Sequence, residues 1–148
     1  MKKQLFPLLF IFSLSIYAQE VEEIYEASDE KYEILENIPF RIVAQKPVFP
    51  GCEEEDKIKC THKLIKNLFD NNFNKELKTE LNLENTQNIF AQFTIDTSGN
   101  IVNIQVRSPH QKIDIETKRV IKLLPVATPG KQDNKEVTVK YTLQYSLN

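Results

Sequence analysis

Three segments in which apolar and polar residues alternate constrain the fold of this chain most. They are IFAQFTID at 89–96, NIVNIQVR at 100–107 and EVTVKYTLQYSL at 136–147. Alternation with a period of two is typical of a β-strand that buries one face. The side chains that this pattern places on the buried face are Ile89, Ala91, Phe93, Ile95, Val102, Ile104, Val106, Val137, Val139, Tyr141, Leu143, Tyr145 and Leu147. The sequence therefore predicts a small sheet with one apolar face.

The connections between these segments indicate how the strands are ordered. DTSGN joins the first two, and its Gly99 can adopt a positive φ without steric cost, so residues 89–107 are predicted to form an antiparallel hairpin. Upstream, IPFRIVAQKP at 38–47 is a short run with β-branched residues that ends at Pro47, and we expect a further strand there.

Two segments have the spacing of amphipathic helices. KIKCTHKLIKNLFDNNF, at 57–73, places one apolar stripe at Ile58, Thr61, Ile65, Leu68 and Phe69. We expect this helix to end near Asn71 and Asn72. The second helix is predicted from an N-cap at Asp114 through Leu124, and Pro125 ends it. Its inward-facing residues are expected to be Val120, Ile121 and Leu124. The order strand, helix, hairpin, helix, strand predicts an α+β fold with two helices packed on one face of a small antiparallel sheet.

The N-terminal region divides into two parts before this domain. Residues 1–19 begin with two lysines, continue through about 12 apolar residues and end in YAQ, which is the pattern of a secretory signal peptide. The apolar run is shorter than the roughly 20 residues of a membrane span, although a retained anchor is the alternative interpretation. Residues 20–37 form an acidic arm, and residues 38–148 form the domain. We expect an exported, periplasmic protein with no integral membrane span after cleavage.

Charge is distributed unevenly along the chain. Residues 20–36 contain eight acidic residues and one lysine, a net charge of minus 7, whereas residues 57–148 contain 14 Lys and Arg against 9 Asp and Glu, a net charge of plus 5. The lysines of the basic part are scattered, and no aromatic platform or groove-reading motif accompanies them. The sequence thus predicts no nucleic-acid partner.

The two cysteines of the chain, Cys52 and Cys60, flank an acidic loop. In an exported protein an even number of cysteines favours a disulfide, and we expect these two to be paired. The alternative is a zinc site that uses both thiolates with His62 and His110, but the spacing matches no usual tetrahedral site. A nucleophilic cysteine–histidine pair lacks an identifiable third group, and no acid–base pair or phosphate-binding loop is present. We therefore expect a binding protein, not an enzyme, without metal or other cofactor.

Several motifs, taken in order, resemble the C-terminal domain of the energy transducer TonB, in the form of short exported proteins of Gram-negative bacteria. They are IPFRIVAQKPVFPGCEE, a second cysteine at Cys60, FTIDTSGNIVNIQV, IETKRVIKLLPVATPGKQ and VTVKYTLQYSL, and they cover roughly residues 38–147. Two positions depart from the family: Phe73-Asn74 replaces an aromatic residue followed by proline, and Gln87 replaces a glycine before the hairpin.

This resemblance implies a function in energy-coupled transport across the outer membrane. Domains of this family bind the TonB box, a short extended segment on the periplasmic side of outer-membrane transporters, by adding it to a sheet edge. The implied partner-binding edge strand is Val137, Thr138, Val139, Lys140, Tyr141, Thr142, Leu143, Gln144 and Tyr145. Lys131, Lys135 and Lys140 are expected to attract acidic groups of the partner.

Two features limit the inferred role. A complete transducer needs an inner-membrane helix and a long linker, and the sequence shows neither, so we expect a binding module that acts in or alongside transport. The alternative is an envelope interaction or structural protein that kept the fold and binds another partner, for example through its acidic arm.

Overall fold

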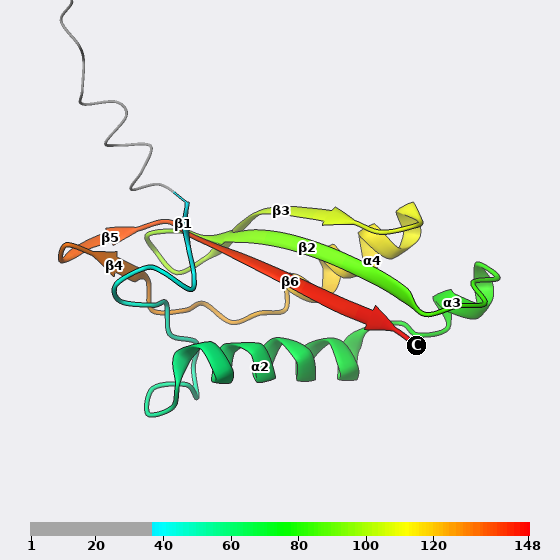
Figure 1. The fold of residues 1–148 in the computed structure, drawn as a ribbon, viewed down its shortest axis with the longest axis horizontal. Coiled ribbons are helices and arrows are strands. Elements are labelled where there is room, and N and C mark those ends of the chain that lie inside the picture. The colour runs from blue at the N-terminus through cyan, green and yellow to red at the C-terminus, as the bar shows by residue number, and fades with distance from the viewer. Residues whose placement is uncertain (1–36) are drawn as a thin grey trace, which may run out of the picture.

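The computed structural model describes residues 37–148, so the predicted signal peptide and all of the arm before Asn37 lie outside the described residues. The main sheet has four strands in the order β1-β6-β2-β3. The elements, in chain order, are β1 (Ile38–Pro39), α2 (Lys57–Asn72), α3 (Leu77–Glu80), β2 (Gln87–Ile95), β3 (Ile101–Arg107), α4 (Gln111–Ile121), β4 (Gly130–Gln132), β5 (Lys135–Val137) and β6 (Val139–Leu147). Figure 1 shows α2 running alongside β6.

The sheet brings together distant parts of the chain. β6 is antiparallel to β2 along its whole length, from Gln87 opposite Leu147 to Ile95 opposite Val139. On the other side of β6, the two residues of β1 run parallel to its first two residues. The β2–β3 pair is the predicted antiparallel hairpin.

The hairpin turn is fixed by its own hydrogen bonds and by a close neighbour. Asp96 Oδ1 accepts from the backbone N–H groups of Ser98 and Asn100, at 2.9 and 2.8 Å. Gly99 has φ +84, and a Cβ there would lie 1.7 Å from the carbonyl oxygen of Ala127. Only glycine therefore allows the turn to approach the segment after α4 so closely.

The helices differ from the predictions mainly at their ends. α2 ends at Asn72, as expected, and Asp56 caps its N-terminus by accepting from Lys59 N–H. α4 begins earlier than predicted, because His110 is its N-cap and Asp114 lies in its first turn. The His110 Nδ1 atom accepts from the Lys112 N–H at 3.1 Å, so an imidazole performs the role that the sequence assigned to a carboxylate.

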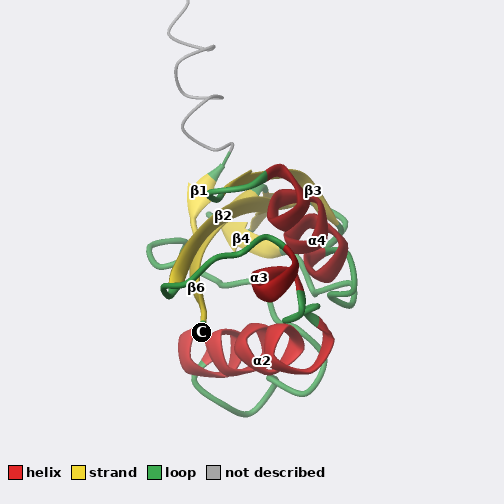
Figure 2. Cartoon of the chain, turned by 90° about the vertical axis from the view of Figure 1, so that its right-hand side faces the viewer, coloured by secondary structure: helices red, strands yellow, loops and turns green. Residues whose placement is uncertain are grey.

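Both long helices pack into one hydrophobic core on the face of the sheet that carries the alternating apolar residues. α2 contributes Ile65 and Phe69, and α4 contributes Ile113, Val120 and Ile121, all buried in the same cluster as Phe93 and Val139. Figure 2 shows the curved sheet with α2 and α4 packed around its inner side. The fold is therefore of the predicted α+β class, with helices covering an antiparallel-rich sheet.

Three strand predictions need correction. The expected strand at 38–47 is reduced to β1, because Pro39 and Pro47 have no N–H to donate and the chain turns after Pro39, whose carbonyl accepts from Ile42 and Val43. The expected strand at 136–147 is interrupted at Thr138, between β5 and β6, and β5 pairs with β4 instead. In β3, the backbone of Asn103 has φ +51 at a register shift, and Val102 pairs with Thr94. Contrary to the prediction from the sequence, the side chain of Val102 therefore does not lie on the face that Ile104 and Val106 share.

The predicted disulfide is present. Cys52 and Cys60 are bonded, with Cα atoms 5.7 Å apart, and both are buried. The bond joins the loop after β1 to the first turns of α2, where Lys57 Nζ also donates to the Cys52 carbonyl at 2.8 Å. The disulfide also contains both sulfur atoms that the zinc alternative required as thiolate ligands.

Polar contacts connect α2 with α4 at the position where the sequence departs from the TonB pattern. Glu116 of α4 forms an ion pair with Arg119 at 2.6 Å, and the Arg119 guanidinium donates to the Asn72 carbonyl at the end of α2. Glu116 Oε1 also accepts from the Asn74 N–H at 2.8 Å, which a proline at this position could not donate. Asn74 thus adds a hydrogen bond between the segment after α2 and α4.

Candidate functional site

From Tyr141 onward, the outer side of β6 is an unpaired strand edge beside a cleft within residues 37–148. β1 covers only the start of that side, where the Ile38 N–H donates to the Thr138 carbonyl and the Phe40 N–H to the Lys140 carbonyl, at 3.0 and 2.9 Å. After Phe40 the chain turns away, as the bonds of Ile42 and Val43 to Pro39 show. From Tyr141 onward, no strand within residues 37–148 pairs with this side of β6.

The two bonds to β1 also fix which backbone groups of β6 point outward. Successive residues of a strand direct their N–H and C=O groups to opposite sides, so the outward carbonyls of Thr138 and Lys140 set the register for the residues that follow. Thr142, Gln144 and Ser146 consequently present their backbone groups at the open edge. Tyr141 and Leu143 direct theirs toward β2. Thr142, Gln144 and Ser146 are also exposed.

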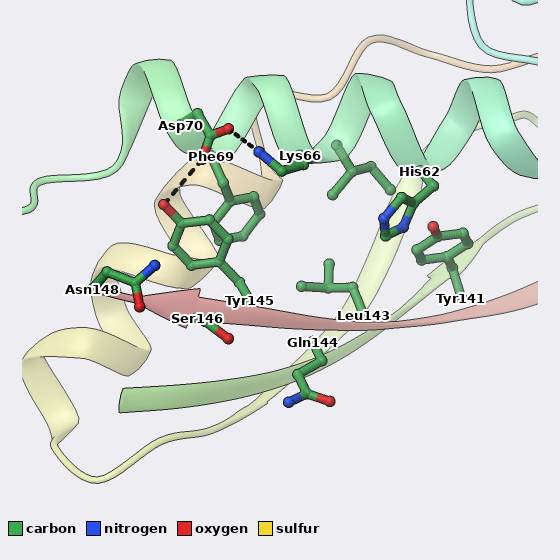
Figure 3. Close-up of a pocket in the computed structure, with 11 residues that line it drawn as sticks. His62, Lys66, Phe69, Asp70, Tyr141, Leu143, Gln144, Tyr145, Ser146 and Asn148 are labelled. Atoms are coloured by element: carbon green, nitrogen blue, oxygen red, sulfur yellow. Dashed lines mark hydrogen bonds and ion pairs between the residues drawn. The ribbon is translucent and has the colours of Figure 1, made fainter. Parts of the chain in front are cut away.

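A groove lies between this edge and α2. It consists of two adjoining pockets of about 290 and 520 Å³, which share His62, Tyr141, Leu143 and Gln144. In Figure 3 the side chains of Tyr141, Leu143 and Tyr145 point from β6 toward α2, whereas Gln144 points away from the helix. We call this space the β6–α2 groove. A strand added to the open edge of β6 would direct alternate side chains into it.

Aromatic side chains form the floor of the groove. Tyr145 packs against Phe69 and Phe73, with ring centroids 4.9 and 5.8 Å apart. Tyr141 packs against Phe40 and Phe93, at 5.1 and 5.3 Å. These contacts fix the inner face of β6, while its outer backbone from Tyr141 onward has no strand partner within residues 37–148. A strand can therefore be added without rearranging the sheet.

One acidic group lies on the α2 side of the groove. Asp70 forms an ion pair with Lys66 at 2.5 Å and accepts from the Tyr145 hydroxyl at 3.4 Å. The hydrogen bond from Lys66 lowers the pKa of Asp70 below its ordinary value. Burial raises the pKa of Tyr145, and the Asp70 charge raises it further. At neutral pH Asp70 is therefore ionised and compensated by Lys66, and Tyr145 is a neutral donor.

The remaining charged side chains that line the groove within residues 37–148 are basic. Arg41, Lys59 and Lys140 line the larger pocket, and none of them forms an ion pair within residues 37–148. With Asp70 compensated by Lys66, the groove has an excess of positive charge. Such a surface favours a partner segment that carries carboxylates.

The predicted site residues fall into two groups. Val139, Lys140, Tyr141, Thr142, Leu143, Gln144 and Tyr145 all lie on β6, and Lys140 lines the groove. Val137 belongs to β5 and Thr138 to the break before β6, so neither belongs to the open part of the edge. Lys131 and Lys135 lie on the β4–β5 hairpin and line neither pocket. The open edge instead includes Ser146, one residue beyond the predicted limit.

The α2 side of the groove was missed at the sequence level. Lys59, His62, Lys66 and Asp70 recur at intervals of three or four residues, which places them on one face of the helix, beside the apolar stripe. The sequence shows this spacing, but the charged face of a helix usually faces solvent and carries no binding site. Nothing local indicates that this face lies beside the free edge of a strand more than 70 residues away.

The described residues offer no arrangement for metal chemistry. No group of three His, Cys, Asp or Glu side chains within residues 37–148 is placed to hold a metal ion. In the same range, no helix has the length and apolar character that a membrane span requires.

Comparison with known families agrees with this geometry. Residues 84–147 match the family described as Gram-negative bacterial TonB protein C-terminal. This segment contains β2, β3, α4 and β6, and therefore the whole open edge. Residues 84–147 belong to the TonB C-terminal domain family. Members of that family are interaction domains of Gram-negative envelope proteins and are associated with energy-coupled transport. No curated protein matches the chain.

Proposed function

We propose that this TonB C-terminal domain is a periplasmic binding module that pairs with an extended segment, the TonB box, of an outer-membrane transporter. The observation that carries the proposal is the open edge of β6, whose outward backbone groups lie beside a groove lined by Tyr141, Leu143 and Tyr145. The family supports the same role. The partner strand would gain backbone hydrogen bonds from Thr142, Gln144 and Ser146.

The groove adds selectivity to this pairing. In an added strand, every second side chain would face α2 and meet the aromatic floor, while the others would face solvent. Carboxylates of the partner would be attracted by Arg41, Lys59 and Lys140, which have no acidic partner within the described part of the chain. An unpaired edge is also an aggregation risk, and a function for that edge explains why the fold leaves it uncovered.

We also propose roles for the predicted signal peptide and the acidic arm. Residues 1–19 would direct export, and residues 20–37 would precede the domain as an acidic segment. Sequencing the N-terminus of the protein recovered from the periplasm tests this division: a start at about residue 19 or 20 supports cleavage, and an intact Met1 supports a retained anchor.

Affinity capture from an envelope extract of the native organism tests the partner. The exported protein is immobilised and its bound proteins are identified by mass spectrometry, beside a Thr142→Pro variant as the matched control. We expect TonB-dependent transporters to be enriched with the native protein and reduced with the variant. If different envelope proteins are captured equally by both, the alternative of an envelope interaction protein with another surface is favoured.

A further inference from the structure

The described chain begins at the same edge of β6 that the groove follows. The Asn37 N–H donates to the Thr138 Oγ1 at 2.7 Å, and Ile38 pairs with Val139 at the covered end of β6. The segment that precedes Asn37 is therefore anchored at one end of the groove. Any binding of that segment to the groove would be intramolecular and would benefit from a high effective concentration.

The charges of the two surfaces are opposite. Residues 20–36 have a net charge of minus 7, from eight acidic residues and Lys31. The groove presents Arg41, Lys59 and Lys140, and the one acidic side chain that lines it within residues 37–148, Asp70, is paired with Lys66. Charge attraction at close range is strong enough to bias a tethered segment toward this face, and it weakens as salt is added.

The tether is also long enough. β6 rises by about 3.3 Å per residue, so the open edge ends roughly 30 Å from the position where Asn37 is held. A segment of 17 residues can span at most about 60 Å when extended. The acidic segment is thus long enough to turn back beside Asn37 and still reach the smaller pocket, at the C-terminal end of β6. Ile24 and Tyr25 provide apolar side chains for the aromatic floor.

We propose that residues 20–36 occupy the β6–α2 groove of their own chain in the absence of a partner. The contact itself is independent of what the partner is. Its consequence rests on the proposed function: the acidic segment competes with the incoming strand and lowers its apparent affinity, so that only a partner with sufficient affinity displaces it.

Zero-length crosslinking of the exported protein tests the contact. A carbodiimide joins carboxylates to lysines that touch them, and mass spectrometry identifies the linked peptides in the monomer fraction at low protein concentration. We expect links from residues 20–36 to Lys59, Lys66 and Lys140, and we expect 0.5 M salt to suppress them. Links mainly to Lys118 on α4 and Lys122 just after it, links only between molecules, or no links at all would overturn the proposal.

Charge neutralisation tests the competition separately. One variant carries Glu22→Gln, Glu23→Gln and Glu26→Gln. The matched control carries Glu80→Gln, Glu84→Gln and Glu136→Gln, at exposed positions that line neither pocket. If the acidic segment leaves the groove free about one third of the time, removing this competition should lower the apparent Kd about threefold. We therefore expect the first variant to bind a synthetic TonB-box peptide about threefold more tightly than the native protein. The control should bind like the native protein.

The two experiments separate the two proposals. Crosslinks to the groove lysines without any peptide binding would refute the proposed partner and retain the intramolecular contact. Equal peptide binding by the native protein and the first variant, without groove crosslinks, would refute the contact and retain the proposed partner.

Discussion

Thr142 and Tyr141 are neighbours on β6 whose backbone amides point in opposite directions. The Thr142 amide lies on the open edge, and the Tyr141 amide faces Phe93 of β2. A proline at Thr142 removes a donor that no strand within residues 37–148 uses, so we expect the melting temperature to change little and peptide binding to weaken at least about tenfold. Isothermal titration calorimetry with a TonB-box peptide and thermal unfolding measure both effects.

Two variants control this test. Thr142→Ala keeps the backbone donor and should bind like the native protein. Tyr141→Pro removes a donor that faces β2 and deletes a buried ring, so it should lose about 3 kcal/mol or more of stability. If Thr142→Pro unfolds the domain while Tyr141→Pro is tolerated, the backbone register derived from β1 is wrong.

Asp96 stabilises the hairpin turn through its charge. Hydrogen bonds from the backbone N–H groups, of which that of Asn100 is the largest cause, lower the pKa of Asp96 below 3.8 in the folded state. A lowered folded pKa means that this stabilisation is fully present above pH 3.8 and is lost as the pH falls through the lower value. Asp96→Asn should therefore unfold at a lower temperature than the native domain at pH 7, with the difference shrinking below about pH 4. A difference that stays constant from pH 7 to pH 2 would contradict this role.

The disulfide acts at the scale of elements, because it joins the loop after β1 to α2. The bond closes a short loop with a sequence separation of 8. On the chain-entropy account, reduction should cost about 2.5 kcal/mol and lower the melting temperature by roughly 10 °C while the fold persists. Calorimetry with and without a reductant measures this, and a Cys52→Ser, Cys60→Ser double variant should match the reduced protein. An unchanged melting temperature would show that the disulfide does not stabilise the fold.

The periodic elements were predictable because their signals are local. The stripe that contains Ile65 and Phe69, the hairpin around Gly99 and the alternation of β6 each follow from burial of one face. The misplaced parts depend on tertiary contacts. β1 is a strand only over the two residues that pair with β6, and the bulge at Asn103 lies where β3 pairs with β2. Ile58, predicted on the buried stripe of α2, lies instead at the rim of the groove.

The site was predictable only on its strand side. Alternation in the last segment indicates a strand, and the resemblance to TonB indicates that its edge binds a partner. Neither shows how far β1 covers that edge, or that α2 forms the opposite wall. Lys59 and His62 enter the groove through helix packing alone, and Lys131 and Lys135 leave it because β5 turns away to pair with β4.

At the scale of the whole molecule, the fold places three features side by side. They are the free edge of β6, the basic and aromatic groove beside it, and the point at Asn37 where the acidic segment joins the domain. Figure 1 shows that β1 meets one end of β6 while the C-terminus lies at the other. A partner strand and the acidic segment thus have access to the same surface, which gives binding and its regulation a common location.

Residue-resolved amide exchange, measured with and without a TonB-box peptide, tests the central claim most directly. If the peptide adds to β6 as a strand, protection should increase at Thr142, Gln144 and Ser146, whereas Tyr141, Leu143 and Tyr145 should change little because their amides already bond to β2. Thr142→Pro should abolish the added protection. Protection confined to the acidic segment or to residues 52–60, with the three β6 amides unchanged, would contradict edge pairing and place the binding surface elsewhere.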